Sequence, residues 1–173
     1  MKKKLLIPLL ITAVLAVGIT LAFMFRQTEP IENKFTDAKV ACSVVEEFND
    51  VQKSSIKVQN DGNIDCYLRV RLVSYWQNGE GEIVGKPSVI PAIDVNDGWM
   101  AGESKDVFYY TSPVAAGKTT ASNLLKSPLE LAREDYNGET VYQVVKVFAE
   151  AVQAEPEDAV KAAWPFFADS RSE

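Results

Sequence analysis

Apolar and polar residues alternate along several short stretches of this chain, and a period of two is typical of strands with one buried face. The clearest stretch is 64–76, in which arginines occupy one face and apolar residues the other. The apolar face carries Cys66, Leu68, Val70 and Leu72, and the polar face carries Arg69 and Arg71. The same pattern predicts strands over 35–48, 54–59, 82–84, 99–100, 107–110 and 140–154, and an edge strand around Pro128. The stretch 140–154 is apolar on both faces, which predicts a central strand that is covered on both sides.

Turn residues separate these strands. Asn78-Gly79 and Asn137-Gly138 are hairpin signals, because both residue types tolerate a positive φ. A helical pattern appears only near the end, where Pro156 stands at a first-turn position and Pro165 predicts the end of the helix. We therefore predict an all-β fold over 37–173, an antiparallel β-sandwich with jelly-roll or immunoglobulin-like connections and a short C-terminal helix.

The N-terminal stretch has the pattern of an export signal, with three lysines followed by an uncharged apolar run from Leu5 to Phe25. This run is long enough to span a bilayer as an anchor, which takes about 20 residues. The small residues Thr20 and Ala22 favour the alternative, a signal helix that is cut between Ala22 and Phe23. Either reading predicts export across the cytoplasmic membrane, to the cell surface or beyond.

A more specific signature overlaps this stretch. The string Gly18-Ile19-Thr20-Leu21-Ala22-Phe23, followed by Asn33-Lys34-Phe35-Thr36, resembles the pattern G-x-T-L-A-aromatic and N-x-F-T of the camelysin/TasA family. The resemblance implies that residues 1–22 are removed by a SipW-type signal peptidase and that the mature protein is extracellular. It also implies self-assembly into biofilm-matrix fibres, in which the segment 23–36 of one copy adds a strand to the next. The donor side chains would be Phe23, Phe25, Ile31 and Phe35.

Strand addition also follows from general physical chemistry, because an incomplete sheet edge presents unpaired N–H and C=O groups that an extended segment can complete. The predicted partners are therefore other copies of the chain, and the peptidase during export. Contact with the membrane is expected only through the N-terminal segment. An alternative is a membrane-tethered surface adhesin, in which the leader is retained.

Composition limits the other functions. The chain has 173 residues, a net charge of −6 and no histidine, and loss of the leader with its three lysines makes the charge −9. An acidic surface of this kind repels nucleic acid and anionic lipid. Camelysin itself is described as a metallopeptidase, which makes proteolysis an alternative, but a zinc site here would have to be built without histidine. We predict no enzyme activity, no cofactor and no metal.

The two cysteines lie on the core-facing sides of predicted strands. Export would permit a disulfide between Cys42 and Cys66, which would join neighbouring strands. The alternative is a pair of buried free thiols that act as small apolar side chains. The spacing in the sequence leaves both open.

Four further features have structural rather than catalytic interpretations. Residues 115–119 imitate the end of a phosphate-binding loop but are predicted to form a turn. Residues 94–98 resemble part of a calcium loop with the wrong spacing, and a solvated loop is predicted. Glu150, inside an apolar strand, is expected to pair with Arg69 or Arg71. The aromatic residues Trp76, Trp99, Tyr109, Tyr110 and Trp164 are expected to pack in the core.

Overall fold

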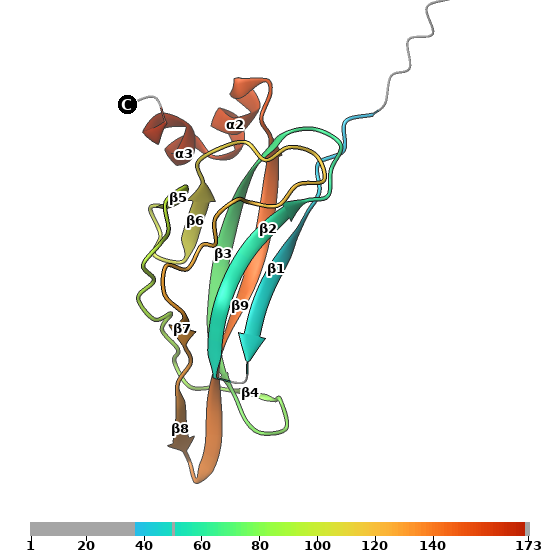
Figure 1. The fold of residues 1–173 in the computed structure, drawn as a ribbon. Helices are drawn as coiled ribbons and strands as arrows, with labels where there is room; N and C mark the ends of the chain where they lie inside the picture. The colour runs from blue at the N-terminus through green and yellow to red at the C-terminus, as the bar shows by residue number, and fades with distance from the viewer. Residues whose placement is uncertain (1–36, 50, 172–173) are drawn as a thin grey trace, which may run out of the picture. The chain divides into compact units, whose positions relative to one another are not determined.

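The computed structural model describes residues 37–49 and 51–171. The compact unit begins at Ala38 and is mostly β, with antiparallel strands and two short helices near the C-terminus (Figure 1). The leader, the cleavage position between Ala22 and Phe23, and the donor residues Phe23, Phe25, Ile31 and Phe35 lie outside the described residues. In the described part of the chain, no helix is long and apolar enough to cross a bilayer.

Two antiparallel sheets contain the strands. The larger has the order β5-β6-β3-β9-β8, with β4 added to β3, and the smaller has the order β1-β2-β7. The larger sheet comprises β3 (Cys66–Gln77), β4 (Ile83–Val84), β5 (Trp99–Ala101), β6 (Val107–Tyr110), β8 (Arg133–Tyr136) and β9 (Glu139–Gln153). The smaller comprises β1 (Cys42–Asn49), β2 (Gln52–Asn60) and β7 (Leu129–Glu130). The longest ladder joins β3 to β9, from the pair Cys66 and Gln153 to the pair Gln77 and Tyr142.

The main core lies on the face of β3 that the alternation predicts. Cys66, Leu68 and Val70 are fully buried there, and Leu72 is 1% exposed. The side chains of Ile56 and Val58 on β2 and Val145 on β9 belong to the same core, together with residues from the loops that follow β6. Residues of both sheets thus surround one apolar core, and burial of its large side chains is the main favourable term in folding.

The opposite face of the larger sheet is covered at one end by α2 (Glu157–Ala163) and α3 (Pro165–Ser170), as Figure 1 shows. A second core lies beneath the helices and consists of Tyr67, Val107, Tyr109, Val160, Trp164 and Phe167. Its rings pack edge-on or stacked, as with Tyr109 on Phe167 at 4.9 Å between ring centroids. The predicted burial of Trp76, Trp99, Tyr109, Tyr110 and Trp164 is confirmed.

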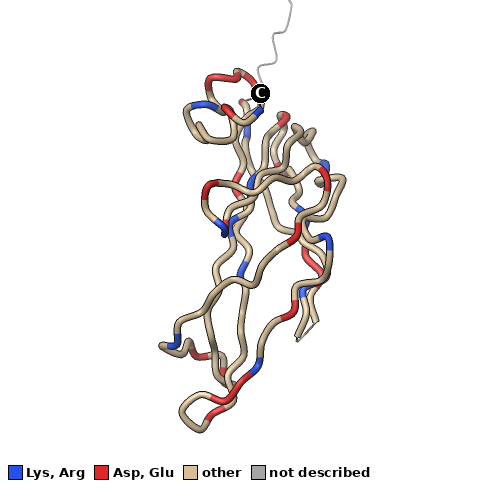
Figure 2. Tube along the Cα trace, turned by 90° about the vertical axis from the view of Figure 1, so that its left-hand side faces the viewer, with Lys and Arg blue, Asp and Glu red and all other residues tan. Residues whose placement is uncertain are grey.

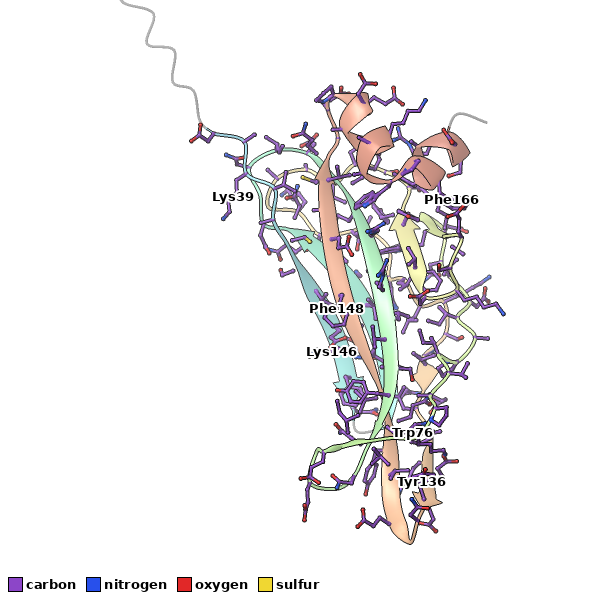
Figure 3. The ribbon with its side chains drawn as sticks, turned by 180° about the vertical axis from the view of Figure 1, so that it is seen from behind. Lys39, Trp76, Tyr136, Lys146, Phe148 and Phe166 are labelled. Atoms are coloured by element: carbon purple, nitrogen blue, oxygen red, sulfur yellow. The ribbon has the colours of Figure 1, made fainter. Side chains whose placement is uncertain are left out.

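Several predictions need correction. The strand 140–154 is not covered on both sides, because Phe148 on β9 is 46% exposed beyond the helices (Figure 3). Strand β8 was not predicted, since its charged residues give no apolar alternation. Pro156 is the N-cap of α2 rather than its first helical residue, and Pro165 begins α3 instead of ending the helical segment. Proline is favoured at the first helical position because its missing N–H needs no partner there.

Candidate functional site

The most unusual feature of the fold is one edge of β9. On one side, β9 pairs with β3 over twelve residues. On the other side, β8 pairs only with Glu139–Tyr142, and the N–H of Gln143 donates to the carbonyl of Ala132 at 2.8 Å. Beyond that point, from Val145 to Gln153, no strand in the described part of the chain pairs with this side of β9.

The register shows which backbone groups face the open side. In an antiparallel sheet, successive residues direct their N–H and C=O groups to opposite edges. The N–H of Gln143 donates to Ala132, away from β3, so the backbone groups of every second residue after Gln143 also face away from β3. These residues are Val145, Val147, Ala149, Ala151 and Gln153. The side chains of the first four belong to or pack against the main core.

Strand β1 lies beside this edge and is itself open on that side. Figures 1 and 3 both show β1 next to β9, yet no ladder joins them. The N–H of Asp61 donates to the carbonyl of Ala41 at 2.8 Å, so odd-numbered residues of β1 face β2. Cys42, Val44 and Glu46 therefore direct their backbone groups away from β2. We call these two open edges, Cys42–Glu46 on β1 and Val145–Gln153 on β9, the seam.

A groove of about 290 Å³ opens at the end of the seam that lies towards the β8–β9 hairpin, where Val145 is; we call it the hairpin end. The groove is lined by Glu46, Phe48, Lys53, Tyr75, Gln77, Leu131, Gln143, Val144, Val145 and Lys146. The lining is partly polar, because it includes Lys53, Glu46 and Gln143. Lys53 is only 5% exposed, and its ammonium group lies 2.7 Å from a carboxylate oxygen of Glu46. The amide of the buried Gln143 donates to the carbonyl of Val89 at 2.9 Å and to the hydroxyl of Ser74 at 3.1 Å.

A β-bulge explains why Lys53 faces this groove. The register between β1 and β2 shifts between Glu47 and Phe48, and beyond the shift Lys53 is buried while Ser54 is exposed. Bulges commonly redirect a side chain in this way. A strict alternation read from Ile56 would instead place Lys53 outside, so periodicity alone misses this residue.

The other end of the seam, towards Gln153 and the C-terminal helices that follow it, is called the helix end; it is apolar and includes Cys42, and Cys66 lies on the neighbouring strand β3. Both are free thiols in this structure, Cys66 fully buried and Cys42 half-buried against the same core. Burial, followed by the nearby Asp61 carboxylate, raises the pKa of Cys42 from 9.0 to about 11. Burial, followed by Asp65, also raises the pKa of Cys66. Both groups are therefore protonated and weakly nucleophilic at neutral pH, and a disulfide after export stays a prediction.

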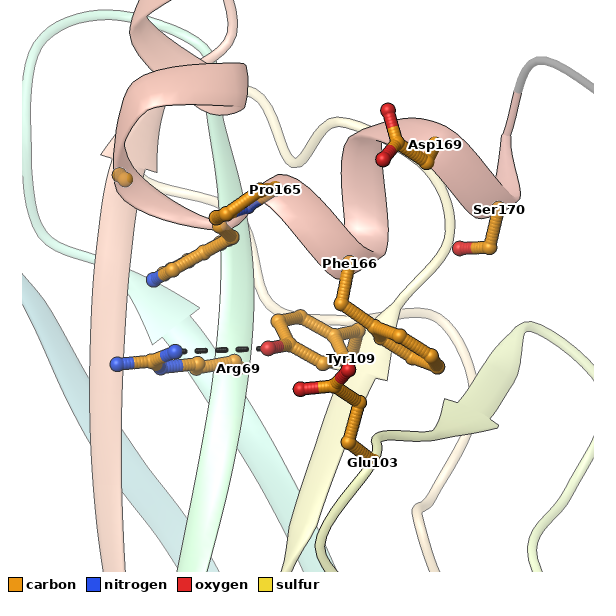
Figure 4. Close-up of a pocket in the computed structure, with 9 residues that line it drawn as sticks. Arg69, Glu103, Tyr109, Pro165, Phe166, Asp169 and Ser170 are labelled. Atoms are coloured by element: carbon orange, nitrogen blue, oxygen red, sulfur yellow. Dashed lines mark hydrogen bonds between the residues drawn. The ribbon is translucent and has the colours of Figure 1, made fainter.

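A second cavity, of about 590 Å³, lies under α3 (Figure 4). Arg69 on its wall donates through Nε to Glu150 at 2.9 Å and through Nη1 to the Tyr109 hydroxyl at 3.4 Å. The guanidinium carbon also lies 5.0 Å from the centre of the Trp164 ring. The predicted pairing of Glu150 with Arg69 is confirmed. Because the guanidinium is held by a carboxylate, a phenol and a ring, this arrangement anchors α3 to the sheet and leaves little charge for a ligand.

The remaining sequence motifs have structural roles. The Asn96 side-chain amide donates to the carbonyls of Asn123 at 3.0 Å and Leu125 at 2.9 Å, which joins the loop 94–98 to the loop before β7. Residues 115–119 form the predicted turn, with Gly117 at a φ of +69°. No group of three or more acidic or cysteine side chains in the described residues is arranged to hold a metal ion.

The sequence does not locate the seam. Two predicted strands, 64–76 and 35–48, approach the length of 140–154 and could have paired with both of its sides. That one side of β9 is open, and that β1 lies next to it, depends on tertiary packing. Comparisons of the chain with models of known protein families, with curated proteins and with solved structures found no match.

Proposed function

We propose that this chain is an exported structural protein that assembles with copies of itself, in an extracellular matrix or on the cell surface. In this proposal, residues 23–36 of one copy enter the seam of the next as an added strand. The observation that carries the proposal is the pair of open edges on β1 and β9, which border the main core and face the same gap. The resemblance of residues 18–36 to the camelysin/TasA signature points the same way.

The chemistry of the seam suits strand addition. An extended segment added at the seam would pair with the open N–H and C=O groups of β9 or of β1, which is the β-augmentation mode of recognition. β1 and β9 would have to move apart to admit it between them, because the two neighbours of an added strand lie about 9.6 Å apart. Pro30 has no N–H and limits pairing to one side of the added strand. Each such hydrogen bond contributes about 0.5–1.5 kcal/mol net, so a run of several bonds gives substantial affinity. An uncovered edge of this length also promotes indiscriminate association. A specific occupant would therefore both complete the fold and suppress unwanted pairing.

The segment 23–36 has a suitable side-chain pattern. Phe23, Phe25, Ile31 and Phe35 are all at odd positions, so in a strand they lie on one face. The core-facing residues at the helix end of the seam are small, because Ala149 and Ala151 occupy that part of β9. Burial of each large donor side chain would contribute about 1.5–3 kcal/mol. In this proposal, large donor side chains would pack over the small alanines next to the open edge.

The segment is also long enough. At about 3.3 Å per residue, fourteen extended residues span about 46 Å, whereas the nine residues of the open edge of β9 span about 30 Å. Roughly nine residues would pair, and the remainder would connect to the body of the donor copy. Such head-to-tail contacts generate fibres when the rotation from one copy to the next does not close a ring.

We further propose that the two sheets form a β-sandwich with jelly-roll or immunoglobulin-like connections, which the added strand would bridge at the seam. Cleavage after Ala22 would then control assembly, because it releases the donor segment from the membrane. Figure 2 shows acidic and basic residues interspersed along the described part of the chain, which suits a body whose contacts come from specific edges rather than from one charged face.

The test compares the mature chain 23–173 with the truncated chain 37–173 by light scattering and electron microscopy. The mature chain is expected to form fibres, and the truncated chain is expected to stay monomeric and to bind a synthetic peptide of residues 23–36. Phe25→Ser should weaken assembly, while Met24→Ser, a matched change on the other face, should leave it intact. Equal polymerisation of both chain lengths would refute strand donation. A mature protein that begins at Met1 would instead support the tethered adhesin.

A further inference from the structure

We propose that the seam also recognises one charge of the incoming segment: Glu29 of the donor copy binds the Lys53 ammonium at the hairpin end of the seam and thereby sets the register of the added strand. This inference rests on the proposed function, since it concerns the same site and the same donor segment. It names the contact that distinguishes the correct alignment of the donor from shifted ones.

Lys53 is an unusual residue to find at an apolar seam. It is 5% exposed, and an ammonium group that is removed from water needs hydrogen-bonding and charged partners. The group has three N–H donors, and among the described residues its hydrogen-bond partner is Glu46. The centre of the Phe48 ring lies 5.1 Å from the same nitrogen. Lys53 therefore has donor capacity that the described part of its own chain leaves unused.

The groove as a whole is more basic than the protein. Lys53 and Lys146 line it together with a single carboxylate, that of Glu46, whereas the chain carries a net charge of −6. The other half of the seam is apolar, with Cys42, Val44, Val147, Ala149 and Ala151 packed against the main core. A segment that fits the seam must therefore combine bulky apolar side chains at one end with an acidic side chain at the hairpin end.

The donor segment has this combination on a single face. Its odd positions, which carry the four apolar donor residues, include one charged residue, Glu29. The other charged residues of the segment are Arg26, Glu32 and Lys34, and all are at even positions. With Glu29 at Lys53, either direction of the donor places two large apolar side chains on the apolar half of the seam. These are Phe23 and Phe25 in one direction, and Ile31 and Phe35 in the other.

This contact would fix the register. A shift of one residue would turn the whole apolar face of the donor outward, and the loss of apolar burial disfavours that register strongly. A shift of two residues preserves the face, so apolar packing alone discriminates against it weakly. However, a shift of two residues towards the helix end would move the Glu29 carboxylate away from Lys53 and into the apolar half of the seam. A shift the other way would also separate it from the Lys53 ammonium. The ion pair therefore supplies the discrimination that apolar packing lacks.

The experiment is a charge exchange between copies of the mature chain. Glu29→Lys and Lys53→Glu each place like charges together in a homopolymer, so each variant alone should need a protein concentration about thirtyfold or more above that of the parent to assemble. An equimolar mixture should assemble near the parental concentration, because each donor then meets a groove of opposite charge. Glu32→Lys, the same charge change on the other face, should assemble as the parent does.

Folding of each variant is checked by its thermal unfolding. Should Lys53→Glu fail to fold beside Glu46, Lys53→Met replaces it, and Glu29→Lys donors should then add to these grooves better than to parental ones. If Glu29→Lys behaves like Glu32→Lys, or if two folded variants do not rescue each other, the pairing is wrong. Strand donation would still stand if removal of residues 23–36 abolishes assembly, and it would fall with the pairing if that truncation has no effect.

Discussion

Proline substitutions at two adjacent residues of β9 test directly which backbone groups face the seam. The register assigns the N–H of Ala149 to the open edge, and it assigns the N–H of Phe148 to the ladder with Arg71 on β3. Proline removes the N–H and places its ring where a pairing strand would lie. The two variants therefore damage different interfaces, although they are neighbours in the same strand.

The magnitudes follow from the same assignment. Ala149→Pro breaks no ladder bond within the body, so its free energy of unfolding should stay within about 1 kcal/mol of the parent. Phe148→Pro leaves the Arg71 carbonyl unpaired inside the sheet, which costs about 1–3 kcal/mol, and the ring clash with β3 adds to this loss. Loss of the Phe148 side chain contributes little, because that side chain is 46% exposed.

Urea unfolding of the truncated chain 37–173 measures the stability of both variants without interference from assembly. Light scattering of the mature chain then measures fibre formation. We expect Ala149→Pro to be nearly as stable as the parent but unable to assemble, since the added strand loses a donor in the middle of the edge and meets the proline ring. If Ala149→Pro is destabilised as strongly as Phe148→Pro, the open edge is wrongly assigned.

Three further predictions concern the body. Leu68→Ala removes a fully buried side chain from the main core and should lower the free energy of unfolding by about 2–5 kcal/mol, measured by urea unfolding. Arg69→Met should cost about 1–3 kcal/mol and shift the melting temperature, because it leaves the Tyr109 and Glu150 side chains without their shared partner. The folded chain binds the Cys42 proton more tightly than the unfolded chain, since burial raises this pKa from 9.0 to about 11. The corresponding stability is complete below pH 9 and is lost as the pH rises towards 11, so a pH series of unfolding curves should be flatter for Cys42→Ala than for the parent.

Much of the body could be predicted from the sequence, because local patterns determine it. The alternation in 64–76 predicts the buried face of β3, and Asn78-Gly79 predicts the turn that pairs β4 with β3. Turn chemistry also predicts the hairpin at Asn137-Gly138, where both residues have a positive φ. In each case the residue that carries the signal also forms the structure, so no distant contact is needed.

The features that depend on distant contacts were missed. Strand β8 lacks apolar alternation, and its pairing with β9 follows from the turn rather than from its own residues. The burial of Lys53 depends on a bulge and on Glu46 in the neighbouring strand. The exposure of Phe148 depends on where the C-terminal helices end, which an apolar pattern does not encode. The seam likewise depends on contacts between residues that are distant in the sequence, so the sequence predicts an incomplete edge without showing where it lies.

The salt dependence of assembly separates the general charge of the protein from the charge at the seam. Without the three lysines of the leader, the mature chain carries a net charge of −9, so copies repel one another at long range, and salt screens this repulsion with a Debye length of about 10 Å at 0.1 M. A pair between Glu29 and the buried Lys53 would be screened much less. Added salt should therefore lower the concentration at which the parent assembles, and it should leave most of the defect of Glu29→Lys in place. Light scattering from 0.05 to about 0.5 M salt measures both effects. If salt removes the difference between Glu29→Lys and the parent, residue 29 meets a solvent-exposed charge rather than the buried ammonium of Lys53.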